Sequence, residues 1–356
     1  MQGTANAFLW PPLVLGTLVF LGIVIGYRCL GFSVLRGDPR EYFLWSSDLW
    51  HHRGFGTHMP GFPALLALAR LLTMDLMDGQ TLLQTVAFVS WLGGLLLADR
   101  ILDRLAPEAR GFGLLWYALA PLVGVATASF PYADGPAYAF FLAALLAALH
   151  ARWWLMAGIT SLGLLNHQSF YPFYFCLALV CVTTRGMRWF HMAASGVPFL
   201  AYYIVIALQR RNPNWIVAEH AKLTLKSRSH VPLFDGILSP ILRFDLKDSV
   251  KVLVLLSIIA ATAWMLTYFV KRRNWTIVSL LLPLLVYALL ANDSASTILI
   301  RLSKILVFPG CLWLTQHRPL LSALESPMAC FSAALLLMAT QVAWAGYEVF
   351  YFSIRH

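Results

Sequence analysis

The chain has 356 residues, of which 60% are hydrophobic and only 12% are charged. This composition excludes an ordinary soluble domain and is typical of a protein with several spans in a lipid bilayer. The formal net charge of +10 does not indicate a nucleic-acid partner. Most Lys and Arg residues lie in short connectors beside apolar runs and in one longer loop, where anionic lipid headgroups explain them.

The first predicted element is an uncharged run at residues 8–27, whose length of about 20 residues is enough to cross a bilayer as a helix. No basic segment precedes this run and no small-residue cleavage site follows it. We therefore expect a signal anchor. Ten further apolar runs follow, at residues 80–98, 111–130, 135–151, 153–165, 169–184, 189–209, 252–270, 275–290, 297–315 and 328–347.

These runs predict an all-α, polytopic integral membrane protein with about eleven transmembrane helices, forming a single domain over residues 1–356. Two longer polar segments lie outside the bilayer: a first outer loop at residues 28–78, with juxtamembrane helices, and a second at residues 210–251. Four short connectors carry most of the Arg and Lys residues found between the other runs, at residues 99–110, 185–188, 271–273 and 317–319, so we expect them to face the cytoplasm. The two loops and the connectors at residues 131–134, 166–168 and 292–296 would then lie on the opposite side. The basic second loop would cover a site or lie along anionic lipid.

The first outer loop has an unusual density of charged and aromatic residues for this chain. It contains Asp38-Pro39-Arg40-Glu41-Tyr42, and later Pro60-Gly61-Phe62-Pro63, which opens a short apolar run at residues 61–74. Asp38 is well suited to cap an amphipathic helix that has Pro39 at its first position. The run at residues 61–74 is too short to cross a bilayer easily and predicts a helix at the interface.

Three other polar motifs lie beside or within the apolar runs. Asp134 precedes the run at residues 135–151, where it would act at a site or cap the helix. His167 lies in a polar break between two short runs, which are either two half-length helices or one kinked helix; such breaks line protein-walled cavities. Arg301 and Lys304 share one helix face, which favours phosphate binding or snorkelling to the headgroups.

The order of these motifs resembles the GT-C superfamily of polytopic membrane glycosyltransferases, which includes mannosyl- and arabinosyltransferases that use polyprenyl-phosphate sugars. Members have an Asp just after the first span, a Tyr four residues later, an amphipathic helix and a Pro-rich start to a short apolar helix. Asp38 and Tyr42 have that spacing, and Pro60-Gly61-Phe62-Pro63 is similar to the Pro-rich start. The resemblance covers the topology of the whole chain, but its specific motifs cover only a short part of it.

The resemblance implies a role for each candidate residue. Asp38 is similar to the catalytic carboxylate of the superfamily and would be the general base, with Glu41 as the alternative base. Asp134 and Tyr42 would bind or orient the acceptor. The donor phosphate would be bound by Arg301, Lys304 and His167, although related enzymes often have an Arg where this chain has His167. A divalent metal near the first-loop acid is compatible with the family, and His51, His52 and His58 are weak candidates for it.

The resulting expectation is a membrane glycosyltransferase that moves a sugar from a polyprenyl-phosphate donor to a lipid or glycan acceptor at the outer leaflet, with inversion. Its partners would be the lipid-linked donor, the acceptor, membrane lipids and, in one alternative, another membrane protein, but not nucleic acid. A bacterial inner membrane and an endoplasmic-reticulum membrane both fit, with the site on the periplasmic or lumenal side. The alternatives are a lipid transporter, another membrane enzyme such as an acyltransferase, or a non-catalytic membrane subunit that shares the fold.

Overall fold

The computed structural model describes residues 9–35, 38–47, 59–120, 133–167, 170–183, 189–210, 246–290 and 303–354. Within these ranges the regular structure is helical and no strand occurs, which confirms the predicted all-α fold class. The chain divides into two compact units. The first comprises Met1–Leu49, Phe62–Leu146 and Lys304–His356, and the second comprises Trp50–Gly61 and Ala147–Ser303. The prediction of a single domain over residues 1–356 stays a prediction.

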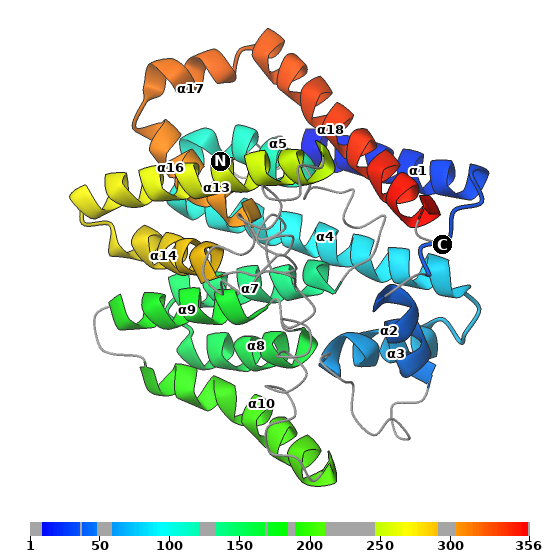
Figure 1. Ribbon diagram of the computed structural model, residues 1–356. Helices are drawn as coiled ribbons and strands as arrows, with labels where there is room; N and C mark the ends of the chain where they lie inside the picture. The colour runs from blue at the N-terminus through cyan, green and yellow to red at the C-terminus, as the bar shows by residue number, and fades with distance from the viewer. Residues whose placement is uncertain are drawn as a thin grey trace. The chain divides into compact units, whose positions relative to one another are not determined.

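The first unit contains most of the helices (Figure 1). They are α1 (Trp10–Cys29), α2 (Asp38–Ser47), α3 (Gly61–Leu72), α4 (Gly79–Leu105), η1 (Pro107–Ala109), α5 (Arg110–Leu119), α7 (Asp134–Leu149), η3 (Ser303–Leu306), α16 (Val307–Thr315), α17 (Arg318–Leu324) and α18 (Pro327–Ile354). The second unit contains α8 (Trp153–Asn166), α9 (Tyr171–Thr183), α10 (Trp189–Arg210), α13 (Leu246–Lys271) and α14 (Trp275–Leu290). Helix α17 was not predicted from the sequence.

Four helices of the described residues are long and apolar enough to cross a membrane, judged by length and composition. They are Trp10–Cys29, Gly79–Leu105, Trp189–Leu208 and Pro327–Gly346. The other predicted spans coincide with helices that are shorter or only partly described, so the count of about eleven spans stays a prediction. The helix that opens at Pro60-Gly61-Phe62-Pro63 has only 12 residues, which agrees with its interpretation as a helix too short to span.

Helix α5 is the centre of the first unit, where it packs against α1, α4, α16 and α18 (Figure 1). A glycine permits one of these close approaches. A Cβ atom at Gly113 of α5 would lie 2.6 Å from the Sγ of Cys311 on α16 and 2.8 Å from a methyl of Leu102 on α4. Small residues at such positions let helices approach closely enough for van der Waals contact to stabilise them.

The C-terminal end of α5 is held by a buried side-chain amide from α18. Helix α5 ends at Leu119, because Ala120 leaves the helical conformation with a ψ of 133°. The Nε2 of Gln341 donates to the carbonyl of Leu119 at 3.3 Å and to that of Ala120 at 2.8 Å. Carbonyls at the end of a helix have no partner within the helix, so this amide satisfies groups that burial would otherwise leave without a donor. The helix thus ends inside the predicted run at residues 111–130, whose last ten residues lie outside the described ranges.

Replacing Gln341 with Leu is expected to lower the free energy of unfolding by about 1–3 kcal/mol, because buried carbonyls lose their donor. The measurement is denaturant unfolding of the purified protein in detergent micelles, followed by circular dichroism. The neighbouring Val342 is exposed, and Val342→Ala is the matched control with an expected change within about 0.5 kcal/mol. Equal stability of the Gln341→Leu variant and the parent would contradict this role of the amide.

Helix α4 continues beyond the apolar run at residues 80–98 and through the first half of the connector at residues 99–110. The reason is a buried ion pair. The guanidinium of Arg110 donates to both carboxylate oxygens of Asp99, at 2.6 and 2.7 Å, and to Asp103 at 2.7 Å. Asp99 and Asp103 lie one turn apart, so they can meet the same guanidinium only if α4 continues. The hydrogen bond with Asp99 raises the pKa of Arg110, against the opposing effect of burial.

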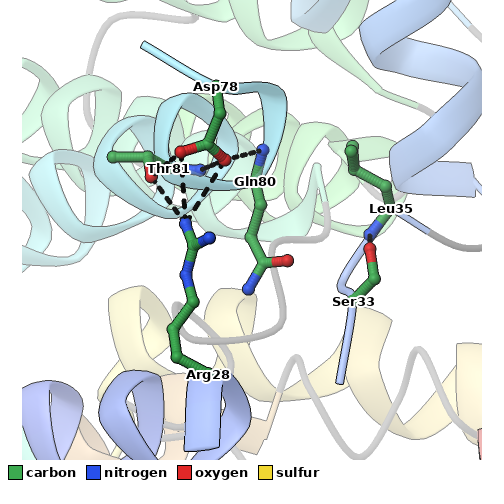
Figure 2. Close-up of polar contacts among 6 residues, drawn as sticks. All are labelled: Arg28, Ser33, Leu35, Asp78, Gln80 and Thr81. Carbon is green, nitrogen blue, oxygen red and sulfur yellow. Dashed lines mark hydrogen bonds and ion pairs between the residues drawn. The ribbon is translucent and has the colours of Figure 1, made fainter. Parts of the chain in front are cut away.

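The two ends of the first outer loop are joined by a second polar cluster (Figure 2). Asp78 caps α4 by accepting from the backbone N–H groups of Gln80 and Thr81, each at 3.1 Å. Arg28, in the last turn of α1, donates to the hydroxyl of Thr81 at 2.7 Å and to both oxygens of Asp78 at 3.3 Å. Burial acts to raise the pKa of Asp78, but the bonds from Thr81 and the charge of Arg28 outweigh it and lower that pKa. The carboxylate therefore keeps its charge and its cap at neutral pH.

In the second unit, α8 packs against α10, and α9 packs against α14, which in turn packs against α13 (Figure 1). Polar atoms cross two of these contacts. The hydroxyls of Thr183 on α9 and Ser279 on α14 lie 3.1 Å apart, and the hydroxyl of Ser161 on α8 donates to the carbonyl of Ser195 on α10 at 2.8 Å. Such bonds between helices suit a membrane interior, where water is absent as a competitor.

Candidate functional site

Helix α2 carries the first-loop motif and has two distinct faces. It begins at Asp38 with Pro39 next, as expected for a helix whose first turn contains a proline. Tyr42 and Ser46 are buried, while Arg40, Glu41 and Leu44 are exposed, so the two sides of α2 differ in burial and the amphipathic helix stays a prediction. The side chain of Asp38 lies outside what the structure describes, so its position is known only as the first residue of α2.

Tyr42 anchors α2 to the rest of the first unit. Its side chain is only 1% exposed, and its ring meets Phe62 edge-on with centroids 5.1 Å apart. Phe62 belongs to the Pro-rich motif that opens α3, so the two parts of the first loop quoted from the sequence are in direct contact. The surrounding core cluster consists of Tyr42, Phe62, Leu66, Leu82, Leu83 and Ala133. Because Ala133 immediately precedes Asp134, α2 and the beginning of α7 share one core.

Asp134 and Lys304 are brought together in the first unit, although they are far apart in the sequence. Asp134 is the first residue of α7, where a carboxylate also interacts favourably with the helix dipole. Lys304 lies in η3 and is 9% exposed. The charge of Asp134 acts on the ammonium of Lys304. The alternative in which Lys304 snorkels to the headgroups is not supported, because the side chain is buried.

Two tyrosines complete the surroundings of Lys304. Its Nζ lies 5.4 Å from the ring centroid of Tyr117 on α5 and 5.8 Å from that of Tyr138 on α7. The two rings are 5.9 Å apart and both are buried. We call Lys304, Asp134, Tyr117 and Tyr138 the lysine cluster. The sequence analysis missed both tyrosines. Tyr138 follows Asp134 by one helical turn, which is a usable signal, whereas nothing local indicates Tyr117.

The lysine cluster is suited to binding an anion. A buried ammonium is costly unless other groups compensate its charge. The faces of the aromatic rings and the carboxylate of Asp134 provide part of this compensation. The contacts recorded for the ammonium are with the two ring faces, and its three N–H donors suit the oxygens of a phosphate group.

His167 occupies the predicted polar break in the second unit. Helix α8 ends at Asn166, and His167 follows in an extended conformation, with φ −162° and ψ 150°. Its side chain is buried, and its carbonyl accepts from the backbone N–H of Phe170 at 3.0 Å. Of the two arrangements that the sequence left open, the structure thus has two separate helices. The predicted contact of His167 with the donor phosphate stays a prediction.

A tight backbone contact lies beside this break. A Cβ atom at Gly61 would be 2.6 Å from the Cα of Asn166 and 2.7 Å from the carbonyl oxygen of Leu165. Gly61 belongs to the Pro-rich motif, and the boundary between the units falls directly after it, so Gly61 lies in the second unit together with Asn166. Only glycine allows the backbones to approach so closely, which explains why position 61 is a glycine.

Several predicted residues lie outside the described ranges. Arg301 is one of them, and the three histidines of the first loop and residues 211–245 of the second loop are others. Comparisons of the chain with protein-family models, with curated proteins and with solved structures found no match. A functional assignment therefore depends on the residues of this chain and on their geometry.

Proposed function

We propose that the chain is a membrane glycosyltransferase of the GT-C type, which moves a sugar from a polyprenyl-phosphate donor to a hydroxyl of a lipid or glycan acceptor. The observation that carries this proposal is the lysine cluster. It presents a buried cation beside an acid, in the same compact unit as the helix that begins at Asp38. Transfer from a lipid phosphate requires a cation that stabilises the leaving phosphate and a carboxylate that acts as base, and the proposal assigns these roles to Lys304 and Asp38.

In the proposed reaction, Asp38 takes the proton of the acceptor hydroxyl, and Glu41 is the alternative base. The acceptor oxygen forms a bond to the anomeric carbon while the bond from that carbon to the phosphate oxygen breaks, so the configuration inverts. The electron pair leaves with the polyprenyl phosphate. Lys304 stabilises the charge that develops on the phosphate. The resemblance to the superfamily assigns the same role to Arg301 and His167. Asp134 and Tyr42 orient the acceptor or the base.

The proposal places this site at the outer leaflet of a bacterial inner membrane or of the endoplasmic reticulum, in a protein with about eleven spans. The short basic connectors would face the cytoplasm. The longest polar segments of the sequence are the two outer loops at residues 28–78 and 210–251, which favours a small acceptor, such as a lipid or a glycan. A divalent metal remains compatible with the reaction but is not required by the residues named above.

Lys304 gives the direct test of the proposal. In Lys304→Met, the second-order rate constant kcat/KM for the donor is expected to fall by about 10²-fold, because one group that stabilises the leaving phosphate is lost. Purified protein in nanodiscs is incubated with labelled polyprenyl-phosphate sugars and a pool of lipid acceptors, and release of polyprenyl phosphate is measured. Lys304→Arg keeps the charge and is expected to retain more activity than Lys304→Met.

The matched control is Lys271→Met, which removes an exposed cation at the end of α13 and should leave kcat/KM unchanged. Vectorial movement of lipid in liposomes without release of polyprenyl phosphate would instead indicate the transporter alternative. A parent protein that transfers no sugar from any polyprenyl-phosphate donor, but co-purifies with a stable membrane partner, would indicate a non-catalytic subunit. Either result would overturn the proposed function.

A further inference from the structure

The surroundings of Lys304 differ in kind from those of Arg110, the other buried cation among the described residues of the first unit. Arg110 is bound by the carboxylates of Asp99 and Asp103 at 2.6–2.7 Å, so its charge is compensated by direct ion pairs. Lys304 instead has two aromatic rings within 6 Å and the charge of Asp134 at longer range. In the first arrangement, the carboxylates occupy the N–H donors of Arg110. In the second, the aromatic rings compensate the charge of Lys304 but are weaker acceptors for its N–H donors than carboxylates are.

Aromatic faces are suited to this second arrangement. A ring attracts a cation through its quadrupole, and the attraction is stronger when both groups are removed from water. It supplies no carboxylate or carbonyl oxygen to compete with an incoming anion. The hydrogens of an ammonium held in this way can still bond to phosphate oxygens. The tyrosines come from α5 and α7, so the position of Lys304 depends on the packing of two separate helices.

The position of Tyr117 depends on a glycine in the neighbouring helix α4. A Cβ atom at Gly94 of α4 would overlap the hydroxyl of Tyr117. The tyrosine can therefore occupy its place only because α4 presents a residue without a side chain at this point. Since Tyr117 is almost fully buried, a larger residue at position 94 would force the ring to move relative to Lys304.

We infer that Tyr117 and Tyr138 are positioning residues, whose rings hold the ammonium of Lys304 where it meets the phosphate of a lipid-linked ligand. This inference rests on the proposed function, because it assigns the phosphate to the same site. The aromatic rings, and not the tyrosine hydroxyls, keep the ammonium of Lys304 in the position where it binds the anion. Gly94 contributes by leaving room for Tyr117.

The test compares binding of polyprenyl phosphate and of the uncharged polyprenol of the same length to the full chain in nanodiscs. Tyr117→Leu is expected to weaken binding of polyprenyl phosphate by about tenfold, in line with a desolvated cation–ring contact, and to leave binding of polyprenol unchanged. Tyr117→Phe keeps the ring and should bind within about twofold of the parent. Tyr138→Leu and Tyr138→Phe repeat the comparison on α7 and replace the first pair if Tyr117→Leu does not fold.

A double-mutant cycle separates positioning from a general structural role. In the Lys304→Met background, Tyr117→Leu should cause no further loss of phosphate binding, because the group that it positions is already gone. A tenfold loss in both backgrounds, or an equal loss for polyprenol and its phosphate, would overturn the inference. So would a Tyr117→Phe variant as weak as Tyr117→Leu.

Failure of the inference differs from failure of the proposed function. If the parent binds polyprenyl phosphate more tightly than polyprenol, and Lys304→Met loses this preference while Tyr117→Leu and Tyr138→Leu keep it, the phosphate site stands and the role of the rings is refuted. If the parent shows no preference for the phosphate, the proposed donor site itself is refuted, and the inference with it.

Discussion

Replacing Asp38 with Asn is expected to lower the rate of sugar transfer by about 10²- to 10⁴-fold, the range over which a general base contributes. Asn has nearly the same shape as Asp but cannot take the proton of the acceptor hydroxyl. It is also a good residue at the N-terminus of a helix, so α2, which begins at residue 38, should keep its position. The loss should appear in kcat with little change in the amount of folded protein.

The measurement is single-turnover release of polyprenyl phosphate, with folding monitored by circular dichroism. Glu41→Gln is the informative comparison, because Glu41 lies on the same helix and is exposed. If Asp38 is the base, Glu41→Gln should stay within about threefold of the parent, far from the loss expected for a missing base. If Glu41→Gln instead loses activity and Asp38→Asn keeps it, the roles are exchanged. Unchanged transfer in both variants would refute a carboxylate base in the first loop.

Much of the helical framework could be predicted from the sequence, because apolar runs of span length have few alternatives to helix in a lipid environment. Helix α2 and the break at His167 were predictable for a different reason, because polar residues interrupt the apolar pattern at both places. The end of α5 at Leu119 was not predictable. It lies within a continuous apolar run, and the amide that satisfies its carbonyls comes from α18, at the far end of the chain.

The candidate site was predictable only in part. Asp134 and Lys304 are ionisable groups beside or within apolar runs, where each is costly and therefore informative. Tyr117 and Gly94 carry no such signal, because tyrosine and glycine are ordinary residues in membrane helices. Their place beside Lys304 appears only in the folded chain, where the hydroxyl of Tyr117 lies against Gly94 and its ring centroid lies 5.4 Å from the Nζ of Lys304.

Arg110→Ala is expected to lower the free energy of unfolding by about 3–5 kcal/mol, because it leaves the carboxylate of Asp99 buried without a partner. Asp99 and Arg110 are each less than a tenth exposed, so water cannot replace the lost guanidinium. The matched control is Arg318→Ala. It breaks an ion pair with Glu108 whose side chains are 79% and 49% exposed, and it should cost no more than about 1 kcal/mol. Unfolding of both variants by denaturant in the same detergent provides the comparison.

The double variant Arg110→Leu with Asp99→Leu separates the cost of an unpaired charge from the value of the ion pair. Replacing both buried partners with apolar residues is often neutral or stabilising, so this variant should recover most of the stability that Arg110→Ala loses. Full recovery would mean that the pair fixes how far α4 continues and where α5 begins, and adds little net stability. A double variant as unstable as Arg110→Ala would mean instead that the bonds to Asp99 and Asp103 are themselves needed, because apolar packing cannot replace them at the junction of α4 and α5.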